Sequence, residues 1–115
     1  MESLKENKCV PCNAGNGRIP DVELSDYCLQ IPEWMIIEEN GIKKLRRDFK
    51  FKNFMEALRF TNLVGNTAED MQHHPVILTQ WGKVEITWWT HKINGLHQND
   101  FTMARKTDEL FNSFV

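Results

Sequence analysis

The chain has 115 residues, a hydrophobic content of 41%, a charged content of 26% and a formal net charge of −2. These values are ordinary for one soluble globular domain, and they lack the basic excess of proteins that bind nucleic acid directly. No apolar run is long enough to span a membrane, and the first residues do not form a signal-peptide pattern. We therefore expect a cytoplasmic protein, with the nucleus as the alternative, that binds neither nucleic acid nor membranes.

The cysteines indicate neither a disulfide framework nor a complete metal site. Three cysteines make an odd number. Cys9 and Cys12 form a Cys-x-x-Cys pair, but a structural zinc site needs two further ligands and there is no second pair. Cys28 lies among apolar residues and is most simply a small core side chain. Residues 1–19 are polar and aperiodic, so we expect a flexible N-terminal arm before a single domain over residues 20–115.

The first predicted elements are a short helix and a hairpin. The helix begins after Pro20, where Asp21 can cap the free amides, and it stops at Pro32. A strand over residues 34–39 follows, and Asn40-Gly41 is the strongest short-range hairpin signal.

The strand that returns from this turn alternates between two faces, as expected for a sheet with one buried side. The predicted core face carries Leu45, Arg47, Phe49 and Phe51. The predicted solvent face carries Lys44, Arg46, Asp48 and Lys50. Arg47 is the exception on the core face, and we expect its head to reach the edge of the sheet while its stem is buried.

A long helix follows, capped by Asn53 and running to about Gln72. Its apolar stripe is broad. The residues predicted to face inward are Phe54, Ala57, Leu58, Phe60, Thr61, Leu63, Val64 and Ala68. Because this stripe is wider than one sheet face demands, part of it is expected to meet a partner subunit.

Pro75 is expected to end the long helix. Two strands then follow, over Val76 to Trp81 and Val84 to Thr90, joined near Gly82-Lys83. A last helix begins near Asn99 or Asp100 and continues to the end of the chain. The order of elements predicts an α+β fold, a four-stranded antiparallel sheet with three helices packed on one face.

Three of the four histidines lie where these elements end. His73 and His74 precede Pro75, and His91 lies at the end of a strand on the face opposite Trp88. Imidazole exchanges protons near neutrality, so these residues could form a proton-transfer site. Glu69 shares a helix face with His73 if the last helical turn persists.

Each of these residues also has a structural interpretation. A lone His91 on a strand is more often structural, and the adjacent pair could meet the negative end of the helix dipole. Trp81 and Trp89 could stack a planar ring or belong to the core. A zinc site is conceivable, although adjacent histidines rarely bind one ion together. His97 is interpreted as a surface residue.

The spacing of these residues resembles the pterin-4a-carbinolamine dehydratases. The signature of that family is matched by Glu69, His73-His74-Pro75, Trp81, His91 and Asp100. The strand from Leu45 to Phe51, and Thr90-His91 followed by Gly95-Leu96, also resemble the family. One departure is His97, where the family commonly has a threonine that caps the last helix.

The resemblance implies a lyase that removes water from 4a-hydroxytetrahydropterin, giving quinonoid dihydropterin in tetrahydrobiopterin recycling. By this resemblance His73 and His91 are the acid/base pair, and His74 acts with them mainly by positioning the substrate. The substrate-binding residues would be Glu69, His74, Pro75, Trp81 and Asp100. No cofactor and no metal are implied.

The resemblance also implies partners. Members of the family are typically homodimers or homotetramers, joined through a sheet edge and a bundle of long helices. The pterin would come from the pathway of an aromatic amino acid hydroxylase. The alternative function is a non-catalytic dimerisation module for a transcription regulator, a role that some relatives also serve.

Overall fold

The computed structural model describes residues 18–114, so most of the predicted arm, with Cys9 and Cys12, lies outside the described residues. The helices are α1 (Asp21–Cys28), α2 (Phe54–Met71), the short 3₁₀ helix η1 (His91–Ile93) and α3 (Gln98–Phe114). The strands are β1 (Met35–Glu39), β2 (Ile42–Lys50), β3 (Val76–Gln80) and β4 (Lys83–Trp88). Within the described residues, no helix is long and apolar enough to cross a membrane.

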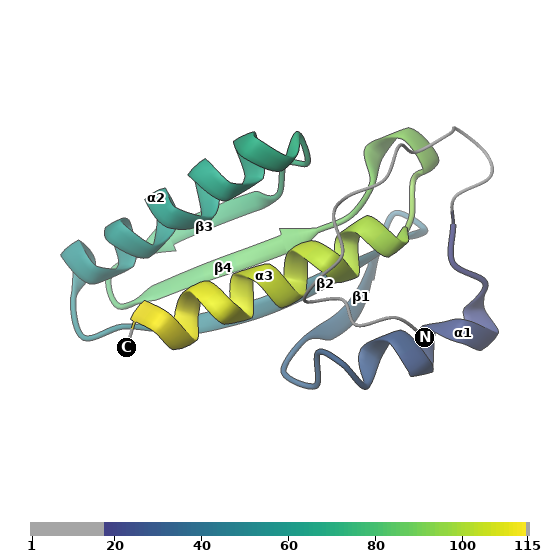
Figure 1. Ribbon diagram of the computed structural model, residues 1–115, viewed down its shortest axis with the longest axis horizontal. Coiled ribbons are helices and arrows are strands. Elements are labelled where there is room, and N and C mark those ends of the chain that lie inside the picture. Colours follow the sequence, from purple (N-terminus) through teal and green to yellow (C-terminus); the bar gives the residue numbers. More distant parts are fainter. Residues whose placement is uncertain (1–17, 115) are drawn as a thin grey trace.

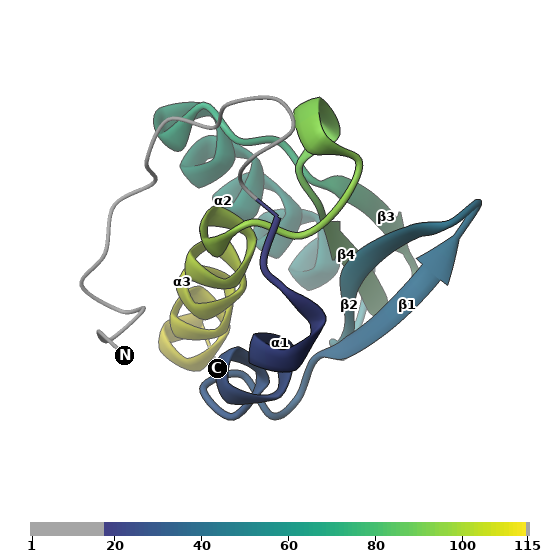
Figure 2. The same cartoon turned by 90° about the vertical axis from the view of Figure 1, so that its right-hand side faces the viewer.

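The four strands form one antiparallel sheet in the order β1-β2-β4-β3. All three α-helices lie on the same side of this sheet, and no helix of the described residues covers the other side (Figures 1 and 2). The register places Leu45 opposite Trp88 and Phe49 opposite Val84, so the apolar faces of β2 and β4 are continuous. The predicted α+β fold is confirmed.

Both predicted hairpins are present, and in each the turn contains residues with positive φ. Asn40 and Gly41 have φ of 53° and 78°, the left-handed pair that a tight two-residue hairpin turn requires. The second turn lies at Trp81 and Gly82, one residue earlier than expected, because Gly82 takes the positive φ of 73°. β3 therefore ends at Gln80.

The core lies between the sheet and the helices, and its largest fully buried side chains are aromatic: Trp88, Phe49, Phe60 and Phe101. α2 contributes Ala57, Phe60, Val64 and Ala68 to it, as predicted. The prediction was wrong for Phe54, Leu58 and Leu63, which are 45%, 37% and 40% exposed. One sheet face can cover only one side of α2, so the outer part of the broad stripe stays uncovered in the single chain.

Asn53 caps α2, as its position predicts. Its side-chain oxygen accepts a hydrogen bond from the Glu56 backbone N–H at 2.9 Å. We expect Asn53→Ala to lower the free energy of unfolding by about 1 kcal/mol, because one helical donor loses its partner. Urea unfolding measures this loss, and Asn53→Asp, which restores an acceptor, should recover it. Equal stability of Asn53→Ala and the native chain would contradict the cap.

The first helix differs from its prediction at both ends. It stops at Cys28, before Pro32, and Asp21 is its first residue and not its cap. Pro20 occupies the cap position and makes no side-chain cap hydrogen bond. The Asp21 carboxylate instead bonds Lys43 Nζ on β2 at 2.9 Å.

Arg47 was also predicted wrongly, because its head does not reach the edge of the sheet. It pairs with the carboxylate of Asp108 on α3 at 2.6 Å, with side-chain exposures of 17% and 9%. The same Asp108 oxygen accepts the indole N–H of Trp34 at 2.8 Å. Burial raises the pKa of Asp108, and the contacts with Trp34 and Arg47 oppose that rise. This network joins β2, α3 and the segment before β1.

Candidate active site

The two adjacent histidines follow a left-handed turn at the end of α2. Gln72 has φ of 54° and ψ of 41°, and its N–H donates to the Glu69 carbonyl at 3.2 Å. The next N–H, that of His73, reaches back to the Ala68 carbonyl at 3.1 Å. These two bonds form a Schellman cap. The helix therefore ends at Met71, four positions before Pro75, and the cap turns His73 away from the helix axis.

His73 lies in a protected position between α2, α3 and β4. Its Nε2 is 2.6 Å from the Asp100 carboxylate, and its side chain is 12% exposed. The imidazole also stacks on Trp88, with ring centroids 5.6 Å apart and an angle of 3° between the planes. Stacking on Trp88 thus fixes the plane of the imidazole, and the contact with Asp100 fixes the direction of Nε2. Of the two ring nitrogens, Nε2 is the one that is hydrogen-bonded within the described part of the chain.

Asp100 joins the separate parts of the site. It is fully buried. Its second oxygen accepts the Thr90 hydroxyl at 2.8 Å and the His97 backbone N–H at 2.9 Å. Thr90 directly precedes His91, so one carboxylate ties His73 to the loop that carries His91. Thr90 was not among the predicted site residues, although the Thr-His pair at the end of a strand was a signal for it.

His91 is not on a strand. β4 ends at Trp88, Thr90 makes an isolated bridge with Gly95, and His91 opens η1. Its side chain is exposed, so the expectation that it points away from the core is confirmed. The imidazole contacts the half-buried Trp89, with ring centroids 4.4 Å apart. Trp89 also lies 4.0 Å below the ammonium group of Lys44.

Glu69 pairs with His74 and not with His73. Its carboxylate is 2.7 Å from His74 Nε2, and both side chains are mostly exposed, at 71% and 58%. Glu69 and His73 were expected to share a helix face only if the last helical turn persisted, and that condition is not met, because the left-handed Gln72 ends the helix before His73. An ion pair this exposed contributes little to stability. Its two side chains can therefore move apart at little cost in free energy when a ligand binds.

Trp81 lies far from the histidines within one chain. Pro75 stands at the start of β3, beside His74, whereas Trp81 follows its end. A five-residue strand separates them, a length of about 16 Å at about 3.3 Å per residue. The indole is 72% exposed in the turn. Trp81 is therefore not the aromatic residue beside His91. That residue is Trp89.

His97 is buried, contrary to its interpretation as a surface residue. It is 8% exposed and directly precedes α3, where its Nδ1 accepts the Asn99 backbone N–H at 3.0 Å. The helix begins at Gln98, one residue before the predicted start. The signal for this role was Asp100, three residues after His97, which is the spacing of a capping box.

Residues 18 and 19 run along the outer side of the loop that carries His91. Arg18 Nε donates to the Ile93 carbonyl at 2.7 Å, and the Ile19 N–H donates to the Leu96 carbonyl at 2.9 Å. A Cβ on Gly95 would lie 3.1 Å from the Arg18 side chain, so glycine permits this close approach.

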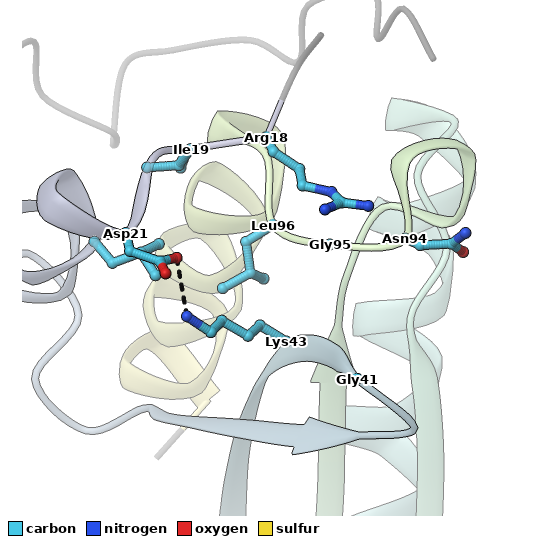
Figure 3. Close-up of a pocket in the computed structure, with 9 residues that line it drawn as sticks. Arg18, Ile19, Asp21, Gly41, Lys43, Asn94, Gly95 and Leu96 are labelled. Atoms are coloured by element: carbon cyan, nitrogen blue, oxygen red, sulfur yellow. Dashed lines mark hydrogen bonds and ion pairs between the residues drawn. The ribbon is translucent and has the colours of Figure 1, made fainter. Parts of the chain in front are cut away.

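A cavity of about 200 Å³ lies between this segment, the loop and the β1–β2 hairpin (Figure 3). It is lined by Arg18, Ile19, Asp21, Leu24, Gly41, Lys43, Asn94, Gly95 and Leu96. No residue of the predicted site lines it. In the described part of the chain, no three His, Cys, Asp or Glu side chains are grouped to hold a metal ion.

Residues 18–110 match the family described as pterin 4 alpha carbinolamine dehydratase. A Saccharophagus degradans protein named "Putative pterin-4-alpha-carbinolamine dehydratase" is 51% identical over 111 residues, covering 96% of this chain and 98% of its own. A Chlorobium luteolum protein of the same name is 49% identical, covering 96% and 97%. The crystal structure of a Brucella melitensis "transcriptional coactivator/pterin dehydratase" superposes with a TM-score of 0.73 at 30% identity, covering 81% of this chain and 97% of that one.

Proposed function

The chain belongs to the pterin 4 alpha carbinolamine dehydratase family, and from this premise we propose that it dehydrates 4a-hydroxytetrahydropterin by histidine acid/base catalysis. The observation that carries the proposal is the His73–Asp100 pair. It holds an imidazole on Trp88 and connects it, through Thr90, to the loop of His91.

The reaction needs two proton movements. The C4a–O bond breaks and the hydroxyl group leaves as water, which requires one proton at the departing oxygen. N5 of the pterin gives up one proton as the C4a–N5 double bond forms, so the protons balance. A general acid and a general base at these two positions each contribute about 10²–10⁴-fold in rate.

His73 and His91 suit these two roles in different ways. Asp100 and Trp88 fix the His73 ring, and its Nδ1 remains for the substrate. His91 is exposed and lies against Trp89, which offers a flat surface beside it.

His74 and Glu69 are proposed to position the pterin. Their exposed pair offers a carboxylate that can accept hydrogen bonds from the amino group and ring N–H of a pterin. Pro75 holds the backbone that follows His74. Asp100 is proposed to act through His73, since its oxygens are already engaged by three protein groups. Trp81 would require a second chain to reach the histidines.

We propose in addition that the chain forms a homodimer or homotetramer. Large apolar side chains are exposed along α2: Phe54, Met55, Leu58 and Leu63. Val76 and Leu78 on the edge strand β3 are 48% and 50% exposed, and an unpaired apolar edge is a site for pairing with another chain.

Leu58→Glu on α2 is expected to lower the molar mass measured by light scattering after size-exclusion chromatography. A charge in an apolar helix interface is desolvated without a partner. Val22→Glu is the matched control, because Val22 is 85% exposed on α1, away from this face. A native chain that is monomeric at micromolar concentration would contradict the proposal.

The proposed physiological setting follows from the reaction. Dehydration of the carbinolamine restores a dihydropterin for reduction, so the chain would support tetrahydrobiopterin recycling beside an aromatic amino acid hydroxylase. The cytoplasmic location remains a prediction.

A second function has one specific observation in its favour, the name of the Brucella melitensis structure, which includes a transcriptional coactivator. A dimerisation module would use the exposed face of α2 and would not need the histidines. Under that alternative, His73→Ala would leave every function of the chain intact.

The test of the proposed activity is the absorbance decay of freshly generated 4a-hydroxytetrahydropterin. We expect the purified chain to accelerate the decay above buffer, and a chelator to leave the acceleration unchanged. Decay at the buffer rate would overturn the activity. Loss of activity on chelation, restored by added zinc, would overturn the metal-free mechanism.

A further inference from the structure

His97 forms an unusual helix cap, with an imidazole in place of a hydroxyl or carboxylate. The ring nitrogen Nδ1 accepts a hydrogen bond from the Asn99 backbone N–H at 3.0 Å, and the backbone N–H of His97 donates to Asp100 Oδ2 at 2.9 Å. This is the reciprocal pattern of a capping box. The side chain of the cap residue accepts a backbone N–H of the first helical turn, and an acidic side chain three residues later accepts the backbone N–H of the cap residue. Two amides at the start of α3 are thereby satisfied.

An imidazole cap differs from an oxygen cap in its response to protons. A serine or threonine hydroxyl accepts a hydrogen bond at any pH between 5 and 9, whereas Nδ1 accepts only while it is unprotonated. A proton on Nδ1 would face the Asn99 N–H and place positive charge at the positive end of the helix dipole. Protonation of His97 therefore abolishes its cap.

The residue that returns the bond is also the residue that holds His73. The Asp100 carboxylate contacts His73 Nε2 at 2.6 Å and the Thr90 hydroxyl at 2.8 Å. Loss of the bond from the Asn99 N–H to His97 Nδ1 would loosen the first turn of α3, which positions this carboxylate. The cap and the proposed acid/base pair are therefore joined by one buried side chain.

We propose that neutral His97 is a positioning residue, whose cap holds Asp100 and through it His73, and whose protonation loosens both. This inference rests on the proposed function for its effect on catalysis. Its effect on folding does not depend on that function.

The charges around His97 fix the direction of the pH effect. In the described part of the chain, the titratable groups that face it are Asp100 on α3 and His73 in the connection from α2 to β3. Burial lowers the pKa of His97; Asp100 opposes this effect and His73 adds to it. The unfolded chain then binds more protons, so the cap's contribution is complete above the ordinary pKa of about 6.5 and is lost as the pH falls below it.

The test compares the native chain with His97→Thr and His97→Ala. Threonine keeps a cap that does not titrate, and alanine removes the cap. We measure the unfolding equilibrium constant in urea between pH 5 and pH 8. At pH 8, His97→Ala should raise this constant about fivefold, whereas His97→Thr should stay near the native value. Between pH 8 and pH 5 the native chain should lose more stability than His97→Thr.

Asn53→Ala is the matched control, because it removes a cap of α2 whose amide does not titrate. Asn53→Ala should lower the free energy of unfolding by the same amount at every pH, so the dependence of stability on pH should keep its native slope. The same pH series for dehydration should show a fall in kcat for His97→Ala of up to about 10²-fold. His97→Thr should restore kcat at pH 8 and lose less of it at acid pH than the native chain.

Two results would overturn the inference. One is a native pH slope retained in His97→Thr, and the other is a His97→Ala chain as stable at pH 8 as the native chain. If the native chain does not dehydrate the pterin, the proposed function fails, while the stability series still decides whether His97 is a proton-sensitive cap.

Discussion

His73→Ala is expected to slow dehydration by about 10²–10⁴-fold, the contribution of one positioned acid/base group. The loss should fall mainly on kcat, because His73 meets the reacting atoms only through its Nδ1. The substitution also removes the partner of one oxygen of a buried carboxylate, at a cost of about 1–3 kcal/mol. The chain should remain folded at 25 °C, which circular dichroism and urea unfolding can verify.

His73→Gln is the control for this experiment. Glutamine can still donate a hydrogen bond to Asp100, so it should recover part of the stability, but it cannot exchange protons near neutrality. We expect it to be as slow as His73→Ala. A glutamine variant with native kcat would show that His73 holds the site together and moves no proton.

Asp100→Ala is expected to be the most destabilising single substitution in the site, by about 3–5 kcal/mol. Three groups lose their partner: the His73 ring, the Thr90 hydroxyl and the His97 backbone N–H. An unsatisfied buried polar group costs about 1–3 kcal/mol each, and partial relaxation reduces the sum. The midpoint of urea unfolding measures the loss.

Asp100→Asn separates this structural role from the catalytic one. Its amide oxygen can still accept from Thr90 and His97, while its NH₂ group faces His73 Nε2 and requires that nitrogen to be an acceptor. The proton of His73 then sits on Nδ1, the nitrogen proposed to face the substrate. We expect stability close to native and a kcat lowered nearly as far as in His73→Ala. Native kcat in Asp100→Asn would contradict the assigned orientation of His73.

Local sequence signals were sufficient for most of the fold. Asn40-Gly41 and Gly82 take the positive φ angles that their hairpins need, and Asn53 caps α2 where its side-chain chemistry predicts. The alternation in β2 correctly separated its two faces. These features depend on interactions a few residues apart, which is the range over which sequence patterns carry information.

The partners of the site residues were harder to predict because they depend on contacts across the fold. Arg47 meets Asp108 across 61 positions, and no periodicity reports such a pairing. Glu69 pairs with His74 instead of His73 because Gln72 ends α2 in the left-handed conformation, for which glutamine has no strong preference. Spacing along the chain also places Trp81 near the motif, although an extended strand carries it away from the histidines.

His97 was also difficult to interpret from the sequence. Imidazoles are uncommon as helix caps, so a histidine before a helix is taken to be exposed at the surface. Only the burial of the ring and the Asn99 N–H pointing at Nδ1 reveal the role. The matching Asp100, three residues later, was present in the sequence but was already assigned to the substrate.

The most direct test of the account is the dehydration rate of freshly generated 4a-hydroxytetrahydropterin with the native chain and with the His73→Ala/His91→Ala double variant, at equal concentration and with folding verified for both. We expect acceleration above buffer by the native chain and decay at the buffer rate with the double variant. Equal acceleration by both chains would contradict the histidine site, and no acceleration by the native chain would contradict the enzyme.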